Sequence, residues 1–66
     1  MSYDEFKGII NATLQASPNG LTWTEIRKRQ PKLYQKWPAN QWVTLLEKDI
    51  GLIRERQKGK VVWRIK

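Results

Sequence analysis

The basic side chains crowded near the end of this sequence are its clearest candidates for binding chemistry. Six of them fall within residues 54–66, and Lys58-Gly59-Lys60 sets two ammonium groups around a glycine where we expect a turn. Ammonium and guanidinium groups pair with phosphates, and such contacts supply affinity without reading sequence. The alternative is that the charges protect a sheet edge from aggregation, for which one or two would suffice. We therefore favour phosphate binding.

A second basic cluster spans Arg27, Lys28, Arg29, Lys32 and Lys36. It precedes the third predicted helix, where it could grip the other side of a nucleic-acid groove. An ordinary solvated helix face is the alternative. The residues that we predict to contact phosphate are Arg27, Lys28, Lys32, Lys36, Arg54, Arg56, Lys58, Lys60 and Arg64.

Between the two clusters lies a helical segment with short polar groups on one face. We predict base contacts from Asn40, Gln41, Thr44 and Lys48. Asn and Gln amides can pair bidentately with adenine, and Thr can reach a base or a thymine methyl. Glu47 on the same face disfavours close phosphate approach, although it could accept from a cytosine amine. An ordinary solvated face is again the alternative.

The charge balance points to a polyanionic partner. The 66 residues contain thirteen Lys and Arg against six Asp and Glu, a formal charge of +7. Residues 1–24 are net −1, whereas residues 25–66 carry twelve basic and four acidic side chains, net +8. A field concentrated in this way attracts polyanions and speeds encounter with them.

Several kinds of catalytic site are missing from the composition. There is no cysteine and no histidine, which excludes disulfides, thiolate chemistry and Cys/His zinc sites. The six acids are scattered, and we see neither a nucleophile–base pair nor a phosphate loop. We therefore expect no enzyme, no cofactor and no metal.

The elements that must position these side chains can be predicted from periodicity, capping and turn signals. They are helices over about 3–16, 23–30 and 38–50, and strands over about 52–57 and 60–65. Leu21 could form a very short further strand, and Pro31 forbids a smooth continuation of the second helix. The pattern predicts one α+β domain over residues 1–66, with three helices and a C-terminal two-stranded hairpin.

Large apolar side chains must hold so small a domain together. We expect all four tryptophans, Trp23, Trp37, Trp42 and Trp63, to be core residues rather than stacking platforms. On the third helix we place Trp42, Leu45, Leu46 and Ile50 on the buried side, and on the last strand Val61, Trp63 and Ile65. The apolar residues that we cannot assign to the core are Tyr3, Tyr34, Val43 and Val62.

The order helix, turn, helix, connector, helix, basic hairpin resembles the winged helix-turn-helix family of DNA-binding domains over roughly residues 3–66. The resemblance rests on Gly20-Leu21-Thr22 leading into Trp23-Thr24-Glu25-Ile26, on Leu45-Leu46 with Gly51-Leu52-Ile53, and on the hairpin around Gly59. It implies that the third helix enters the major groove and that the hairpin, or wing, touches the backbone or minor groove. The connector from Pro31 to Trp37 is longer than in the simplest members.

Three functions are compatible with these features. The first is duplex DNA binding, as a transcription regulator or a replication, repair or plasmid-associated module. The others are binding of structured RNA and interaction with a protein partner. No apolar run is long enough for a membrane span and no signal-peptide pattern opens the chain, so we expect an intracellular protein, cytoplasmic in a prokaryote or nuclear in a eukaryote. We expect a monomer or a part of something larger.

Overall fold

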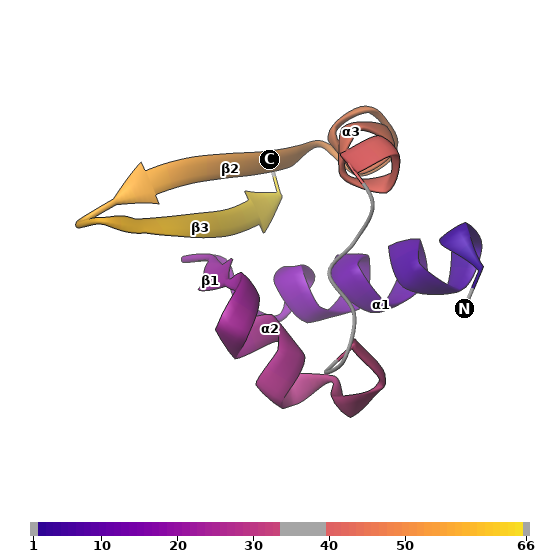
Figure 1. Cartoon of the computed structure of the whole chain (residues 1–66), viewed down its shortest axis with the longest axis horizontal. Coiled ribbons are helices and arrows are strands. Elements are labelled where there is room, and N and C mark those ends of the chain that lie inside the picture. The colour runs from indigo at the N-terminus through magenta and orange to yellow at the C-terminus, as the bar shows by residue number, and fades with distance from the viewer. Residues whose placement is uncertain (1, 34–39, 66) are drawn as a thin grey trace.

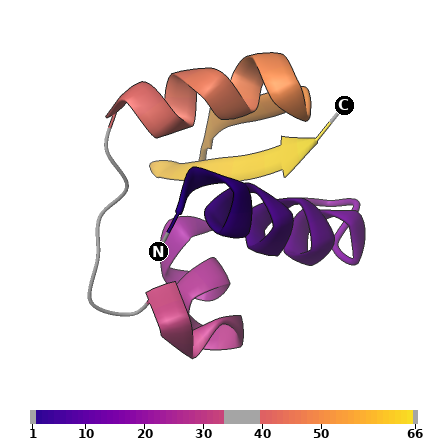
Figure 2. The same ribbon diagram turned by 90° about the vertical axis from the view of Figure 1, so that its right-hand side faces the viewer.

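The computed structural model describes residues 2–33 and 40–65. Over these residues the chain forms an α+β fold with three α-helices and a three-stranded antiparallel sheet (Figure 1). In Figure 2, β3 crosses the middle of the molecule, α3 lies above it, and α1 and then α2 lie below. The elements in chain order are α1 (Tyr3–Gln15), β1 (Leu21–Thr22), α2 (Trp23–Arg29), a 3-10 turn (Pro31–Leu33), α3 (Asn40–Asp49), β2 (Leu52–Gln57) and β3 (Lys60–Ile65).

Helix α1 begins where the sequence predicts, because the Ser2 hydroxyl accepts a hydrogen bond from the Glu5 amide at 3.1 Å. Its buried side carries Phe6, Ile10 and Leu14 at helical spacing. It ends at Gln15, one residue before the predicted limit. The helix therefore presents one apolar stripe to the rest of the fold.

Helix α2 is held by a complete capping box. Thr22 Oγ1 accepts from the Glu25 amide at 3.2 Å, and Glu25 Oε1 accepts from the Thr22 amide at 2.8 Å. The helix ends at Arg29, and Gln30 leaves the helical region with φ −127° and ψ 87°. This is the effect expected of a residue before proline, and the chain continues as a single 3-10 turn that buries Leu33.

Helix α3 is described from Asn40, so the predicted positions 38 and 39 lie outside the described residues. It ends at Asp49, and Gly51 follows with φ +69°, the left-handed conformation in which a glycine commonly ends a helix. The helix is tied to α1 at this end, since the Tyr3 hydroxyl donates to Asp49 Oδ2 at 2.7 Å.

The predicted buried face of α3 is partly wrong. Val43 and Leu46 are buried and Trp42 and Ile50 are half-buried, but Leu45 is 42% exposed. Successive helical residues turn by about 100°, which places Val43 in the same stripe as Leu46 and Ile50 and leaves Leu45 at its margin. The apolar stripe is therefore centred further round the helix than the sequence alone suggested.

The hairpin strands have the predicted bounds. Their turn has positive φ at both central residues, 50° at Lys58 and 78° at Gly59, as a two-residue type I′ turn requires. The predicted short strand at Leu21 also forms, and it pairs with β3 to give the order β1-β3-β2. The sheet thus has a third strand in addition to the hairpin.

The sheet is joined to the helices by a close approach at β1. Gly20 has φ +89°, and a Cβ at this position would lie 2.5 Å from Val62 Cγ1 and 2.9 Å from the Trp63 carbonyl oxygen. Only glycine satisfies both the backbone conformation and the space. The register that follows pairs Leu21 with Trp63.

Aromatic rings fill the centre of the core. Trp23 and Trp63 are buried with centroids 5.1 Å apart, and half-buried Trp42 packs on Phe6 at 5.2 Å. The expected core role is therefore confirmed for Trp23 and Trp63 and in part for Trp42, whereas Trp37 lies outside the described residues. The buried core is Phe6, Ile10, Leu14, Leu21, Trp23, Ile26, Leu33, Val43, Leu46, Leu52 and Trp63.

Candidate nucleic-acid interface

The hairpin projects beyond the helices (Figure 1), and its register decides which basic side chains share a face. Directly opposite residues lie on the same side of a sheet, and Arg54 pairs with Trp63 and Arg56 with Val61. Since Trp63 points into the core, Arg54 and Arg56 lie on the side of the sheet that the helices cover. Towards the tip this side is open to solvent.

Val61 shows where the helices stop covering the hairpin. It was predicted to join Trp63 and Ile65 on the apolar face, but it is 42% exposed. Strand β1 pairs with β3 only at Val62 and Trp63, so Val61 lies beyond the end of the covered region. The register confirms the predicted side of Val61, but the residue is not buried, because alternation sets the side of a sheet and not how far the covering layer extends.

An ion pair connects this side of the hairpin to α3. Arg54 Nη2 lies 3.9 Å from Glu47 Oε1, and both side chains are well exposed. Glu47 belongs to the polar face of α3 that also carries Thr44 and Lys48. The outer face of α3 and the helix-facing side of the hairpin are therefore adjacent parts of one surface.

The predicted base-contact residues are all exposed. They are Asn40, Gln41, Thr44 and Lys48, and all four belong to α3. Thr44 donates its hydroxyl to the Asn40 carbonyl at 3.0 Å, which holds the side chain along the helix and leaves its oxygen able to accept. The structure places this set together on one element.

Arg64 does not belong to this surface. It lies opposite Ile53, on the sheet face away from Trp63, where it pairs with Glu55 from the neighbouring strand. Hydrogen bonds from Arg64, and secondarily from Gln57, hold the pKa of Glu55 below its ordinary value. The predicted phosphate set is thus divided between the two faces of the hairpin.

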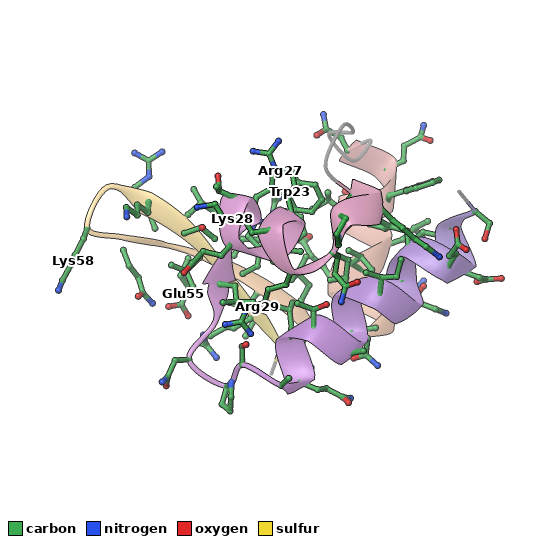
Figure 3. All side chains as sticks on the ribbon, turned by 90° about the horizontal axis from the view of Figure 1, so that it is seen from below. Trp23, Arg27, Lys28, Arg29, Glu55 and Lys58 are labelled. Atoms are coloured by element: carbon green, nitrogen blue, oxygen red, sulfur yellow. The ribbon has the colours of Figure 1, made fainter. Side chains whose placement is uncertain are left out.

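Three hairpin cations are differently placed. Arg56, Lys58 and Lys60 are exposed and make no ion pair with any residue in the ranges 2–33 and 40–65. In Figure 3, Lys58 lies at the extreme tip and points away from the body of the molecule. The uncompensated positive charge of the hairpin is therefore concentrated towards its tip.

A shallow groove lies between the start of α2 and the start of β3. It is lined by Thr22, Trp23, Thr24, Arg27, Lys60 and Val61. Figure 3 shows the Arg27 side chain projecting outward from α2 beside Trp23. The groove therefore joins a cation of each predicted basic cluster, Arg27 from one and Lys60 from the other.

The electrostatics of Glu25 agree with this geometry. Its pKa is lowered mainly by the hydrogen bonds with Thr22 in the capping box, and the charges of Lys60 and Arg29 lower it further. The Lys60 ammonium is thus close enough to the first turn of α2 to act on a carboxylate there. That carboxylate is itself engaged with the Thr22 amide at 2.8 Å.

The rest of the second basic cluster is spread out. Lys28 is exposed on α2 and Lys32 is exposed on the 3-10 turn that follows, while Lys36 lies outside the described residues. Arg29 donates to the Ser17 hydroxyl at 2.9 Å and so points to the turn after α1. Among the described members, Arg27 is the one that lines the groove beside the hairpin.

Four residues that line the groove were not among the predicted site residues, namely Thr22, Trp23, Thr24 and Val61. No local pattern could have identified them, because their proximity depends on the pairing of β1 with β3 across some forty residues of chain. The capping signal at Thr22 did place Thr24 in the first turn of α2. It could not place that turn against β3.

The described part of the chain offers no metal-binding cluster. No group of three or more acidic residues that could hold a metal ion occurs in residues 2–33 and 40–65. None of the helices described is long and apolar enough to cross a membrane. Comparison with protein-family models, curated proteins and solved structures gave no match.

Proposed function

We propose that this protein is a winged helix-turn-helix module that binds nucleic acid, with duplex DNA as the preferred partner. In this proposal the exposed face of α3 lies in the major groove, and the β2–β3 hairpin is the wing that contacts the backbone or minor groove. The chain carries out no catalysis and acts by occupying its site.

The observation that carries the proposal is the contact between Glu47 of α3 and Arg54 of β2 at 3.9 Å. It places the polar face of α3 and the basic side of the hairpin on one continuous surface. A surface with neutral amide and hydroxyl groups on a helix and cations beside it matches the division between base and phosphate contacts. The +8 charge of residues 25–66 supports the same partner.

The backbone of the turn gives independent support. Lys58 adopts φ 50°, a left-handed conformation that asparagine and glycine adopt more readily than lysine. A basic side chain at that position costs folding free energy that a better turn residue would not. A charge at the tip, where no acid among the described residues compensates it, is explained if the tip meets phosphate.

The test is a salt titration of binding to a random DNA duplex. Neutralised phosphates release counterions, so the affinity should fall steeply with salt, with a slope of about −0.9 in log–log form per phosphate contacted. Replacing Arg56 and Lys58 with alanine should lower the slope by about one unit for each phosphate that is no longer neutralised. Lys7→Ala, which removes one charge from α1 outside the proposed surface, is the control and should leave the slope unchanged.

The neutral residues of α3 should behave differently. Alanine at Asn40, Gln41 or Thr44 should leave the slope nearly unchanged and cost about 1–3 kcal/mol for each bidentate base pairing removed, on a selected site only. Absence of a complex at about 50 mM salt would overturn the nucleic-acid proposal. Tighter binding of an A-form RNA duplex would replace DNA with structured RNA. It would also contradict the placement of α3 in the major groove, because the deep, narrow major groove of RNA excludes a helix.

A further inference from the structure

We propose that the groove between α2 and β3 is a binding site for a single backbone phosphate, held jointly by Arg27 and Lys60. The inference rests on the proposed function and specifies one contact within it. In this inference one residue from each predicted basic cluster contacts the same phosphate, instead of each cluster contacting a separate part of the duplex backbone.

Positive charge converges on the groove from two elements. Arg27 comes from the middle of α2 and Lys60 from the first position of β3, yet both line the same groove. A guanidinium fork and a mobile ammonium complement each other on phosphate, because the first fixes orientation and the second acts as a point charge. Two cations on one anion make a stronger site than either alone.

The remainder of the lining suits a nucleic-acid backbone. Thr24 is exposed and carries a hydroxyl that can donate to a phosphate oxygen. Val61, 42% exposed, offers an apolar surface beside the cations. A phosphodiester presents charged oxygens next to an apolar sugar face, so this mixture of groups fits a backbone segment better than a free anion.

Both walls of the groove are fixed by hydrogen bonds within the fold. Its α2 wall begins at the Thr22–Glu25 capping box, and its β3 wall is fixed by the pairing of Thr22 with Val62. Glu25, whose pKa the charge of Lys60 lowers, is held in the capping box by the Thr22 amide and lies outside the groove lining. The two cations are therefore held on a prearranged frame.

The experiment compares salt slopes for Arg27→Gln, Lys60→Gln and the double variant on one random duplex. If both cations share a phosphate, each single variant should keep most of the slope, because the remaining cation still displaces the counterion. The double variant should then lose about 0.9 units. If they hold separate phosphates, each single variant should lose about 0.9 and the double variant about 1.8, and the proposal fails.

The control pair is Arg27→Gln with Lys58→Gln. Lys58 lies at the hairpin tip, far from Arg27 in Figure 3, so the slope changes of this pair should add. All variants must keep the parent's thermal midpoint and its dispersed amide spectrum. Non-additivity in the control pair as well would show that slope changes do not report shared phosphates here, and it would remove the support for the site.

Binding of a small phosphate anion tests the groove site independently of duplex binding. Tripolyphosphate added to the parent should shift the amides of Thr24 and Lys60, and the double variant should lose these shifts. If the parent binds no duplex but shows these shifts, the phosphate site stands and the duplex proposal fails. If the duplex binds without perturbing either amide, the function stands and this site is wrong.

Discussion

Replacing three glycines one at a time tests how β1 is attached to the sheet. Gly8 lies within α1, and an added Cβ would meet nothing within 4 Å. Gly8→Ala should therefore stabilise the protein by about 1 kcal/mol, the helix propensity difference. Gly59 has φ +78° with open space around it, so Gly59→Ala should cost only the left-handed backbone term of about 1–2 kcal/mol.

Gly20→Ala should lose the same backbone free energy as Gly59→Ala and, in addition, free energy from a steric clash. Its new Cβ would lie 2.5 Å from Val62 Cγ1, which a side-chain rotation can relieve, but also 2.9 Å from the Trp63 carbonyl oxygen, which it cannot. Strand β1 must then move away from β3. Overpacking of this kind costs about 1–3 kcal/mol, so the total is roughly 2–5 kcal/mol.

The assay is urea unfolding followed by circular dichroism and tryptophan fluorescence, with the free energy of unfolding taken from the midpoint and slope. From the most to the least stable, the expected order is Gly8→Ala, the parent protein, Gly59→Ala and Gly20→Ala. Equal losses for Gly20→Ala and Gly59→Ala, within about 0.5 kcal/mol, would refute the close approach of β1 to β3. The register that forms the α2–β3 groove would then have no support.

Three further predictions concern the core, the acids and the turn. Trp63→Ala should cost about 3–5 kcal/mol, enough to unfold a domain of this size, and loss of amide dispersion would show it. Glu25 and Glu55 have pKa values below the ordinary 4.5, so their contribution to stability is complete above that pH and is lost as the pH falls through the lowered values. Thermal melts between pH 7 and 2 should show this loss, and it should be smaller in Glu25→Gln and Glu55→Gln; identical pH profiles would contradict the assignment. Lys58→Asn should stabilise the turn by about 0.5–1 kcal/mol while weakening duplex binding, and a gain in both would refute a binding role for the tip.

Elements with strong local signals could be predicted closely from the sequence. The capping box at Thr22 and Glu25 fixed the start of α2, and the turn at Lys58-Gly59 fixed both hairpin strands. These signals act over three or four residues and do not depend on the rest of the fold. The end of α2 was equally predictable, because Pro31 restricts the residue before it.

Features set by contacts distant in sequence could not be predicted. The exposure of Leu45 depends on how α3 is rotated against its neighbours, and that of Val61 on where β1 ends. Both residues are apolar and lie at the margin of a covered region, where periodicity gives no answer. The division of the basic residues between the two faces of the hairpin is different, because alternation along the strands already separates Arg64, which adjoins Trp63, from Arg54, which lies opposite Trp63.

The acids of the hairpin region show where its affinity should reside. Arg54 and Arg64 are paired with Glu47 and Glu55, so a phosphate would have to displace a carboxylate to use either arginine. Exposed ion pairs are worth at most about 1 kcal/mol, so displacement is feasible but offsets part of the gain. On the proposed binding, the three hairpin cations without an ion pair among the described residues, which are Arg56, Lys58 and Lys60, would gain the full counterion release. A count of basic residues gives every cation of the hairpin equal weight. The acids pair only with Arg54 and Arg64 among the described hairpin cations, so we expect phosphate affinity to be greater at the outer half of the hairpin than at its base.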